Sequence, residues 1–130
     1  LMNKILVEVS VGELLDKISI LEIKQKQIKD PEKLRFISEE HSILKDQLKK
    51  NVKSDDKLEN LFQSLKEINS KLWDIEDNKR LCEKDKNFNE KFIQLSRDVH
   101  FLNDDRAVIK LKINNYTGSK IKEIKQYTKY

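Results

Sequence analysis

The fold is decided by residues 57–85, KLENLFQSLKEINSKLWDIEDNKRLCEKD, which carry the cleanest apolar pattern in the chain. Apolar side chains recur there at alternating spacings of three and four residues, a period that matches one face of an α-helix. The stripe is interrupted by Lys79 and otherwise consists of Leu58, Leu61, Leu65, Ile68, Leu72, Ile75 and Cys82. Asp55 or Asp56 precedes it as an N-cap. We therefore predict one long amphipathic helix here.

The same periodicity predicts three further helices, at about residues 11–29, 32–50 and 90–116. Ser10 is the expected N-cap of the first, Asp30-Pro31 separates the first from the second, and Gly118 ends the last. The chain has only 2 glycines and 1 proline, too few for the turns of a β-sandwich, a barrel or a doubly wound sheet. We predict an all-α fold in which a short antiparallel hairpin and a long one form a four-helix bundle, with residues 1–118 as a single domain.

Two segments lie outside the predicted helices. Residues 4–9, KILVEV, favour a β conformation but are too isolated to form a sheet. We expect a short extended N-terminal arm that lies on the core or pairs with the arm of a second copy. Residues 119–130 form a basic C-terminal tail that is expected to be solvated.

The charge pattern disfavours nucleic-acid binding. The chain has 27 basic and 23 acidic residues, and its net charge of +4 is concentrated in residues 87–130, while the preceding part is balanced. Nucleic-acid binders usually gather basic charge on one face or helix of the fold. Weak nucleic-acid binding through the tail is therefore only a second alternative function.

Several other classes of protein are excluded or disfavoured by composition. The longest apolar run is three residues, so we expect no membrane segment or signal peptide, and a cytoplasmic location. The single cysteine, Cys82, excludes an internal disulfide and a cysteine-based metal cluster. The two histidines do not fall in a metal-binding motif, so neither a metal nor a cofactor is predicted.

Arg106 interrupts the apolar stripe of the fourth predicted helix. An arginine facing the core needs carboxylate or carbonyl partners, because an unpaired buried charge is very costly. The carboxylates considered as partners are Glu22, Glu76 and Asp77. Antiparallel pairing of the helices places Arg106 level with Asn69, and Asn69 level with Ser38. Our first interpretation is an internal ion network that fixes the register of the helices.

The residues of this network are expected to form a polar layer inside the bundle. Its predicted members are Glu22, His41, Asn69, Asn103 and Asp104. His41 is interpreted as a hydrogen-bonded core residue rather than a metal ligand.

An alternative interpretation is a pocket for an anionic metabolite that carries a phosphate or a carboxylate. Its anion-binding residues would be Lys24, Arg80, Arg97 and Arg106, because arginine's planar fork suits these groups. Were the protein an enzyme, Glu76 or Asp77 would be the acid/base residue and His100 an auxiliary one. The sequence leaves the question of catalysis open and favours a non-enzymatic protein.

The unequal hairpins predict a homodimer. At about 1.5 Å per residue, the long helices exceed the short ones by more than about 10 Å. Apolar side chains on this overhang would lack cover within one chain, and uncovered patches commonly mark an interface. They include Trp73, Ile75, Leu81 and Phe92. The leading functional hypothesis is therefore an interaction or assembly module that acts as a homodimer.

Several segments resemble the signatures of a bacterial family catalogued as a domain of unknown function. They are ILVEVSVGELLDKISILEIK at residues 5–24, LWDIED at residues 72–77 and NDDRA at residues 103–107, with Arg80, Phe92-Ile93 and Arg97 between them. The resemblance covers nearly the whole chain. It implies a cytoplasmic protein of a bacterium or bacteriophage, and it implies no activity.

Overall fold

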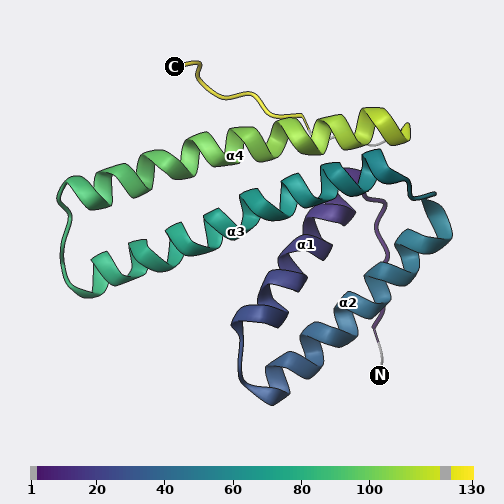
Figure 1. Ribbon diagram of the computed structural model, residues 1–130, viewed down its shortest axis with the longest axis horizontal. Helices are drawn as coiled ribbons and strands as arrows, with labels where there is room; N and C mark the ends of the chain where they lie inside the picture. The colour runs from purple at the N-terminus through teal and green to yellow at the C-terminus, as the bar shows by residue number, and fades with distance from the viewer. Residues whose placement is uncertain (1–2, 121–123) are drawn as a thin grey trace.

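The computed structural model describes residues 3–120 and 124–130, and within them the chain forms four helices joined by short connections (Figure 1). The helices are α1 (Val11–Gln27), α2 (Pro31–Asn51), α3 (Asp56–Lys84) and α4 (Glu90–Thr117). The described residues contain no strand. The predicted all-α, four-helix fold is confirmed. Residues 121–123 of the predicted tail lie outside the described residues.

Each helix begins at a polar side chain that accepts a hydrogen bond from a backbone N–H of the first turn. These N-cap residues are Ser10, Asp30, Asp55 and Asn89. Pro31 occupies the first position of α2, where its missing N–H costs nothing. Gly118 ends α4 with a left-handed backbone, φ 68°, which glycine adopts without steric strain. The local chemistry of the sequence therefore explains where the helices start and where α4 stops.

The long helices α3 and α4 run side by side, and α1 packs against both of them near one end of the pair (Figure 1). α2 packs along α1 on the side away from α4. The central position of α1 follows from its composition, because seven of its 17 residues are buried, whereas α2 has no buried residue.

The central position of α1 corrects one expected pairing. Asn69 of α3 does not meet Ser38 of α2: its side chain bonds α1, and Ser38 instead lies 3.4 Å from Gln25 Nε2. The expectation assumed that α2 and α3 face each other. α1 lies between them because apolar residues cover more than one of its faces.

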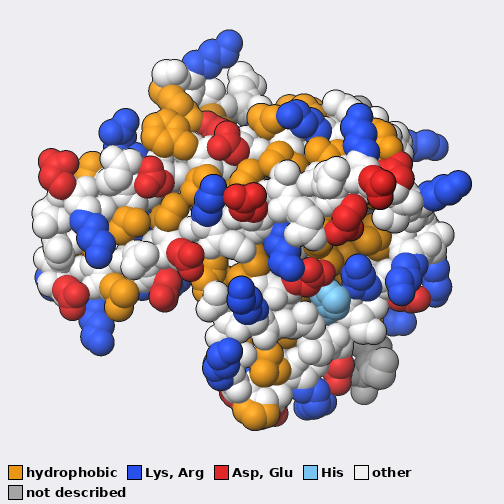
Figure 2. Space-filling model, viewed as in Figure 1, with side chains coloured by type: hydrophobic (Ala, Val, Ile, Leu, Met, Phe, Trp, Pro, Cys, Tyr) orange, Lys and Arg blue, Asp and Glu red, His pale blue; other side chains and the backbone are white. Residues whose placement is uncertain are grey.

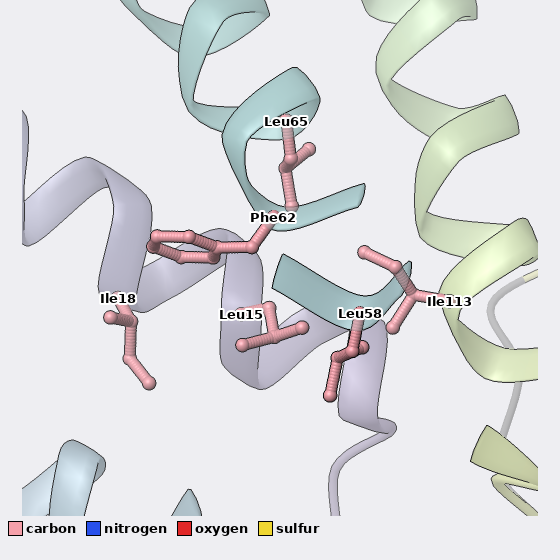
Figure 3. Packing of buried hydrophobic residues seen from close by; sticks show 6 residues of the cluster. All are labelled: Leu15, Ile18, Leu58, Phe62, Leu65 and Ile113. Carbon is pink, nitrogen blue, oxygen red and sulfur yellow. The ribbon is translucent and has the colours of Figure 1, made fainter. Parts of the chain in front are cut away.

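The hydrophobic core sits where α1 meets α3 and α4, close to the start of α3 (Figure 3). Its buried members are Leu15, Ile18, Leu58, Phe62, Leu65 and Ile113. Side chains of α2, including Leu44 and Leu48, pack against it from the outside. The core therefore joins all four helices at one end of the molecule.

The other half of the long hairpin extends past α1 (Figure 1). Across residues 70–109 the only buried residue is Cys82. Trp73, Ile75 and Phe92 are half-buried, and Leu81 is 49% exposed. This part of α3 and α4, residues 70–109, is called the outer hairpin below.

The N-terminal arm does not lie on the core. Residues 3–9 are extended without secondary structure, and the side chains of Ile5, Leu6 and Val7 are 73–87% exposed. The first of the two expected positions for the arm is therefore wrong. Among the described helices, none combines the length and apolarity needed to cross a membrane.

Candidate functional site

The centre of the molecule contains a buried carboxylate, Asp16 of α1, which is 1% exposed. Arg106 of α4 donates to it through two guanidinium nitrogens: Nε lies 3.0 Å from Oδ1, and Nη2 bonds Oδ2. Asn69 of α3 donates to the same Oδ1 at 2.8 Å. The two-pronged contact fixes the guanidinium plane, and the three residues tie together α1, α3 and α4.

Further polar contacts extend this cluster along α1 and α4. Lys110 Nζ lies 2.6 Å from Glu13 Oε2 and 3.6 Å from Asp16 Oδ2. Ser19 Oγ accepts from Asn69 Nδ2 at 2.8 Å and donates to the backbone oxygen of Asp16 at 2.7 Å. Because each buried polar group has a partner, the cluster is a stable part of the interior.

α1 and α4 approach so closely here that only a glycine fits. The backbone N–H of Gly12 donates to Asn114 Oδ1 at 2.7 Å. A Cβ atom at Gly12 would lie 2.6 Å from the backbone oxygen of Lys110, well inside contact distance. The absence of a side chain at Gly12 therefore sets the spacing at which the Asp16 cluster forms.

The ionisation of Asp16 is controlled by its partners. Burial raises the pKa of this carboxyl, because it disfavours the charged form. The hydrogen bonds from Arg106 and Asn69 and the charges of Arg106 and Lys110 outweigh burial, and the pKa lies below its ordinary value. Asp16 is therefore a carboxylate at neutral pH and balances the charge of Arg106.

The expected partners of Arg106 are corrected by this arrangement. Glu22, Glu76 and Asp77 were considered, but the carboxylate that binds the guanidinium is that of Asp16. Asn69 does lie level with Arg106, as predicted, since both donate to Asp16 Oδ1.

The residues expected to form one polar layer are divided among several contacts. Glu22 accepts from Lys66 Nζ at 2.9 Å and lies 3.0 Å from His41 Nε2, so it joins α1 to α2 and α3. Burial raises the pKa of Glu22, but the hydrogen bonds from His41 and Lys66 lower it by more than burial raises it. The pKa of Glu22 therefore lies below its ordinary value. Asn103 Oδ1 lies 3.5 Å from Arg106 Nη1. Asp104 faces the tail instead and accepts a hydrogen bond from the Tyr130 hydroxyl.

A pocket of about 410 Å³ opens where α1 and the outer hairpin diverge, and Figure 2 shows the surface hollowed in this region. It brings together Arg80, Arg106, Glu76 and Asp77 of the predicted site. Its remaining lining residues are Ile20, Ile23, Asn69, Leu72 and Trp73. We call it the Trp73 pocket. Lys24, in the last turn of α1, is not among the described residues that line it.

A second pocket, of about 770 Å³, lies between α4 and tail residues 125–130. Arg97 and His100 line it, and Arg106 borders both pockets. The guanidinium of Arg97 lies 5.7 Å from the centre of the Phe101 ring, and the Tyr130 ring meets Phe101 edge-on at 5.7 Å. The predicted arginines therefore do not all line the same pocket. We call the pocket between α4 and residues 125–130 the tail pocket.

No group of three or more His, Cys, Asp or Glu side chains within the described part of the chain is arranged to hold a metal ion. Cys82 is a buried free thiol on the inner face of α3.

Three of the segments that carry the family resemblance, residues 5–24, 72–77 and 103–107, supply residues of the Asp16 cluster and the Trp73 pocket. A model of a family of unknown function, DUF6165, matches residues 5–130. The chain belongs to this family. No curated protein and no solved structure gives a significant match to the chain. Membership in DUF6165 therefore confirms the resemblance and assigns no activity.

Proposed function

We propose that the protein is an assembly module that forms a homodimer through its outer hairpin. The observation that carries the proposal is that Cys82 is the only buried residue in residues 70–109. Two helices alone cannot cover their apolar stripes, and most of the stability of a helix comes from packing such a stripe against other elements. A partner would supply the missing cover.

Three of the five exposed large apolar side chains of the outer hairpin lie near its turn. Leu81, Phe88 and Ile93 are each 49% exposed, and the Phe88 ring packs edge-on against Phe92 with centroids 5.3 Å apart. Figure 2 shows hydrophobic patches among the charges over α3 and α4. Apolar groups gathered in this way are typical of an interaction surface.

Charge balance favours a second copy of the chain as the partner. Residues 70–109 contain eight basic and nine acidic side chains. A strongly acidic or basic partner would gain nothing from such a surface, whereas a two-fold pair of identical hairpins can set each sign of charge against its opposite. Two hairpins packed together make a four-helix bundle, which encloses apolar stripes that one hairpin leaves open.

The experiment is the measurement of molar mass by light scattering on the wild type and two variants. Ile93→Glu places a charge in the proposed interface, and Ile43→Glu places the same charge on α2, where the wild-type side chain is 63% exposed. We expect a dimer for the wild type and for Ile43→Glu, and a monomer for Ile93→Glu. A wild type that is monomeric at all concentrations, or two variants with the same mass, would contradict the proposal.

A second candidate function, the binding of an anionic metabolite, is supported by the tail pocket. In its lining Arg97 lies near the Phe101 ring and Lys125 near the Tyr127 ring, and rings beside cations suit an aromatic anion such as a nucleotide. His100 is the member of the predicted acid/base set that lines this pocket. Glu76 and Asp77 line the Trp73 pocket instead.

Calorimetric titration with ADP tests this second candidate. Arg97→Ala is expected to weaken ADP binding by about tenfold or more, as loss of a charge-assisted contact does. Arg35→Ala is the control, because Arg35 is an exposed arginine of α2 that also lies over an aromatic ring, that of Phe36. This variant is expected to leave ADP binding unchanged. Equal binding by both variants would contradict an anion site here.

A further inference from the structure

The Trp73 pocket is built differently from an anion site. Its walls are apolar: Ile20 and Ile23 of α1 face Leu72 and Trp73 of α3. Trp73 is the only tryptophan in the chain and is half-buried. An indole ring in the wall of a pocket offers a flat surface for an apolar stem and, through the negative face of its ring, for a cation.

The charges around this pocket are predominantly negative. Glu76 and Asp77 are exposed at its edge, and Arg80 follows one turn later on α3. Arg106 lies at the inner end, where its charge is balanced by the Asp16 carboxylate. With Arg106 and Asp16 cancelling each other, two carboxylates remain against one guanidinium. A phosphate or carboxylate would therefore meet net repulsion here, in contrast to the sequence-based expectation for Arg80 and Arg106.

We propose that the Trp73 pocket binds an organic cation, a primary ammonium or guanidinium group carried on an apolar stem. The cation lies near the Trp73 ring and the carboxylates of Glu76 and Asp77, where charge-assisted hydrogen bonds and the cation–π attraction act together. The stem packs against Ile20, Ile23 and Leu72. The pocket lies on the outer hairpin but away from its turn, since Phe88 and Ile93, the exposed apolar residues near the turn, do not line it.

The intrinsic fluorescence of Trp73 reports on the pocket directly, since no other tryptophan contributes. Three probes with the same stem separate charge from apolar contact: n-hexylamine, n-hexanol and hexanoate. We expect a saturable change in fluorescence with n-hexylamine, at least tenfold weaker binding of n-hexanol, and no saturation with hexanoate. Tighter binding of hexanoate than of n-hexylamine, or no saturation with n-hexylamine up to tens of millimolar, would overturn the proposal.

Variants of exposed residues on α3 provide the second arm of the test. Combined Glu76→Gln and Asp77→Asn is expected to weaken n-hexylamine binding about tenfold or more, and Arg80→Gln is expected to strengthen it. Asp74→Asn is the matched control, because Asp74 lies next to Trp73 in sequence but lines a different surface pocket. Binding that is unchanged in the double variant, or weakened equally by Asp74→Asn, would overturn the proposal. Light scattering on the same samples separates binding from any change of oligomeric state.

Discussion

Asp16 and Arg106, which are 90 residues apart in the sequence, form a two-pronged ion pair that joins α1 to α4. The carboxylate is 1% exposed, and the guanidinium is only partly accessible. Arg106 belongs to the outer hairpin, so the pair ties this hairpin to α1, and Arg106 borders both pockets. It therefore holds in place the elements on which each proposed function depends.

Asp16→Asn is expected to lower the free energy of unfolding by about 3–5 kcal/mol, because it removes one charge of a buried ion pair, the carboxylate that the Arg106 guanidinium binds. The amide is nearly the same size as the carboxylate, so packing is conserved. The change in the free energy of unfolding therefore measures the loss of the charge. Urea unfolding followed by circular dichroism measures the change.

A double-mutant cycle with Arg106→Met checks the same pair from both sides. The Asp16→Leu and Arg106→Met double variant is expected to lose less stability than the sum of the two single variants, because neither leaves a charge behind once both are removed. Additive losses would contradict the direct coupling of the two side chains.

The stability of the protein is expected to fall in acid. The pKa of Asp16 is lowered in the folded state, so its contribution is present in full above the pKa of the unfolded chain, about 3.9, and is lost as the pH falls through the lower folded value. Glu22 acts in the same direction. Urea unfolding at a series of pH values should show a steeper acid decline for the wild type than for Asp16→Asn. Equal slopes would assign the decline to other groups.

Gly12→Ala is expected to destabilise the fold by about 1–3 kcal/mol, as overpacking of an interior does. The added Cβ would lie 2.6 Å from the backbone oxygen of Lys110, which cannot turn aside as a side chain can. In an exposed helix the same change would stabilise by about 1 kcal/mol. Ser64→Ala, at an exposed position of α3, serves as the control and is expected to be neutral or slightly stabilising. A stabilised Gly12→Ala would show that α1 and α4 do not meet at this glycine.

The helices could be predicted because their signals are local. The apolar stripe from Leu58 to Cys82 and the N-cap residues Ser10 and Asp55 specify structure over a few residues, independently of the rest of the chain. Antiparallel pairing also placed Arg106 level with Asn69, and both side chains bind Asp16 Oδ1. The prediction was less successful where several helices meet.

The sequence-based prediction does not include Asp16, because it rests on a single apolar stripe of the first helix. A second stripe, with spacings of four, three and four, contains Gly12, Asp16, Ser19 and Ile23, and all four residues are buried. Small and polar residues in that pattern indicate a second packed face, so the signal was present in the sequence. The position of α2 could not be obtained from the antiparallel pairing of helices that follow each other in sequence. Its contact with α1 rather than α3 depends on how many faces α1 buries.

Residues in the outer hairpin are expected to exchange their backbone hydrogens at a rate that depends on protein concentration. Dimer formation would protect residues 88–100, whereas dissociation would leave two helices with little tertiary support. Hydrogen exchange at high and low protein concentration should differ there and agree in the core around Ile18 and Leu65. Identical protection at both concentrations, in a range where the mass changes, would place the interface elsewhere.

The most direct test of the proposed assembly function is the molar mass measured by sedimentation equilibrium over a range of concentrations. We expect a mass that approaches twice the 15.5 kDa of the chain for the wild type and stays at that of one chain for Ile93→Glu. A mass of one chain for the wild type at every concentration would contradict it.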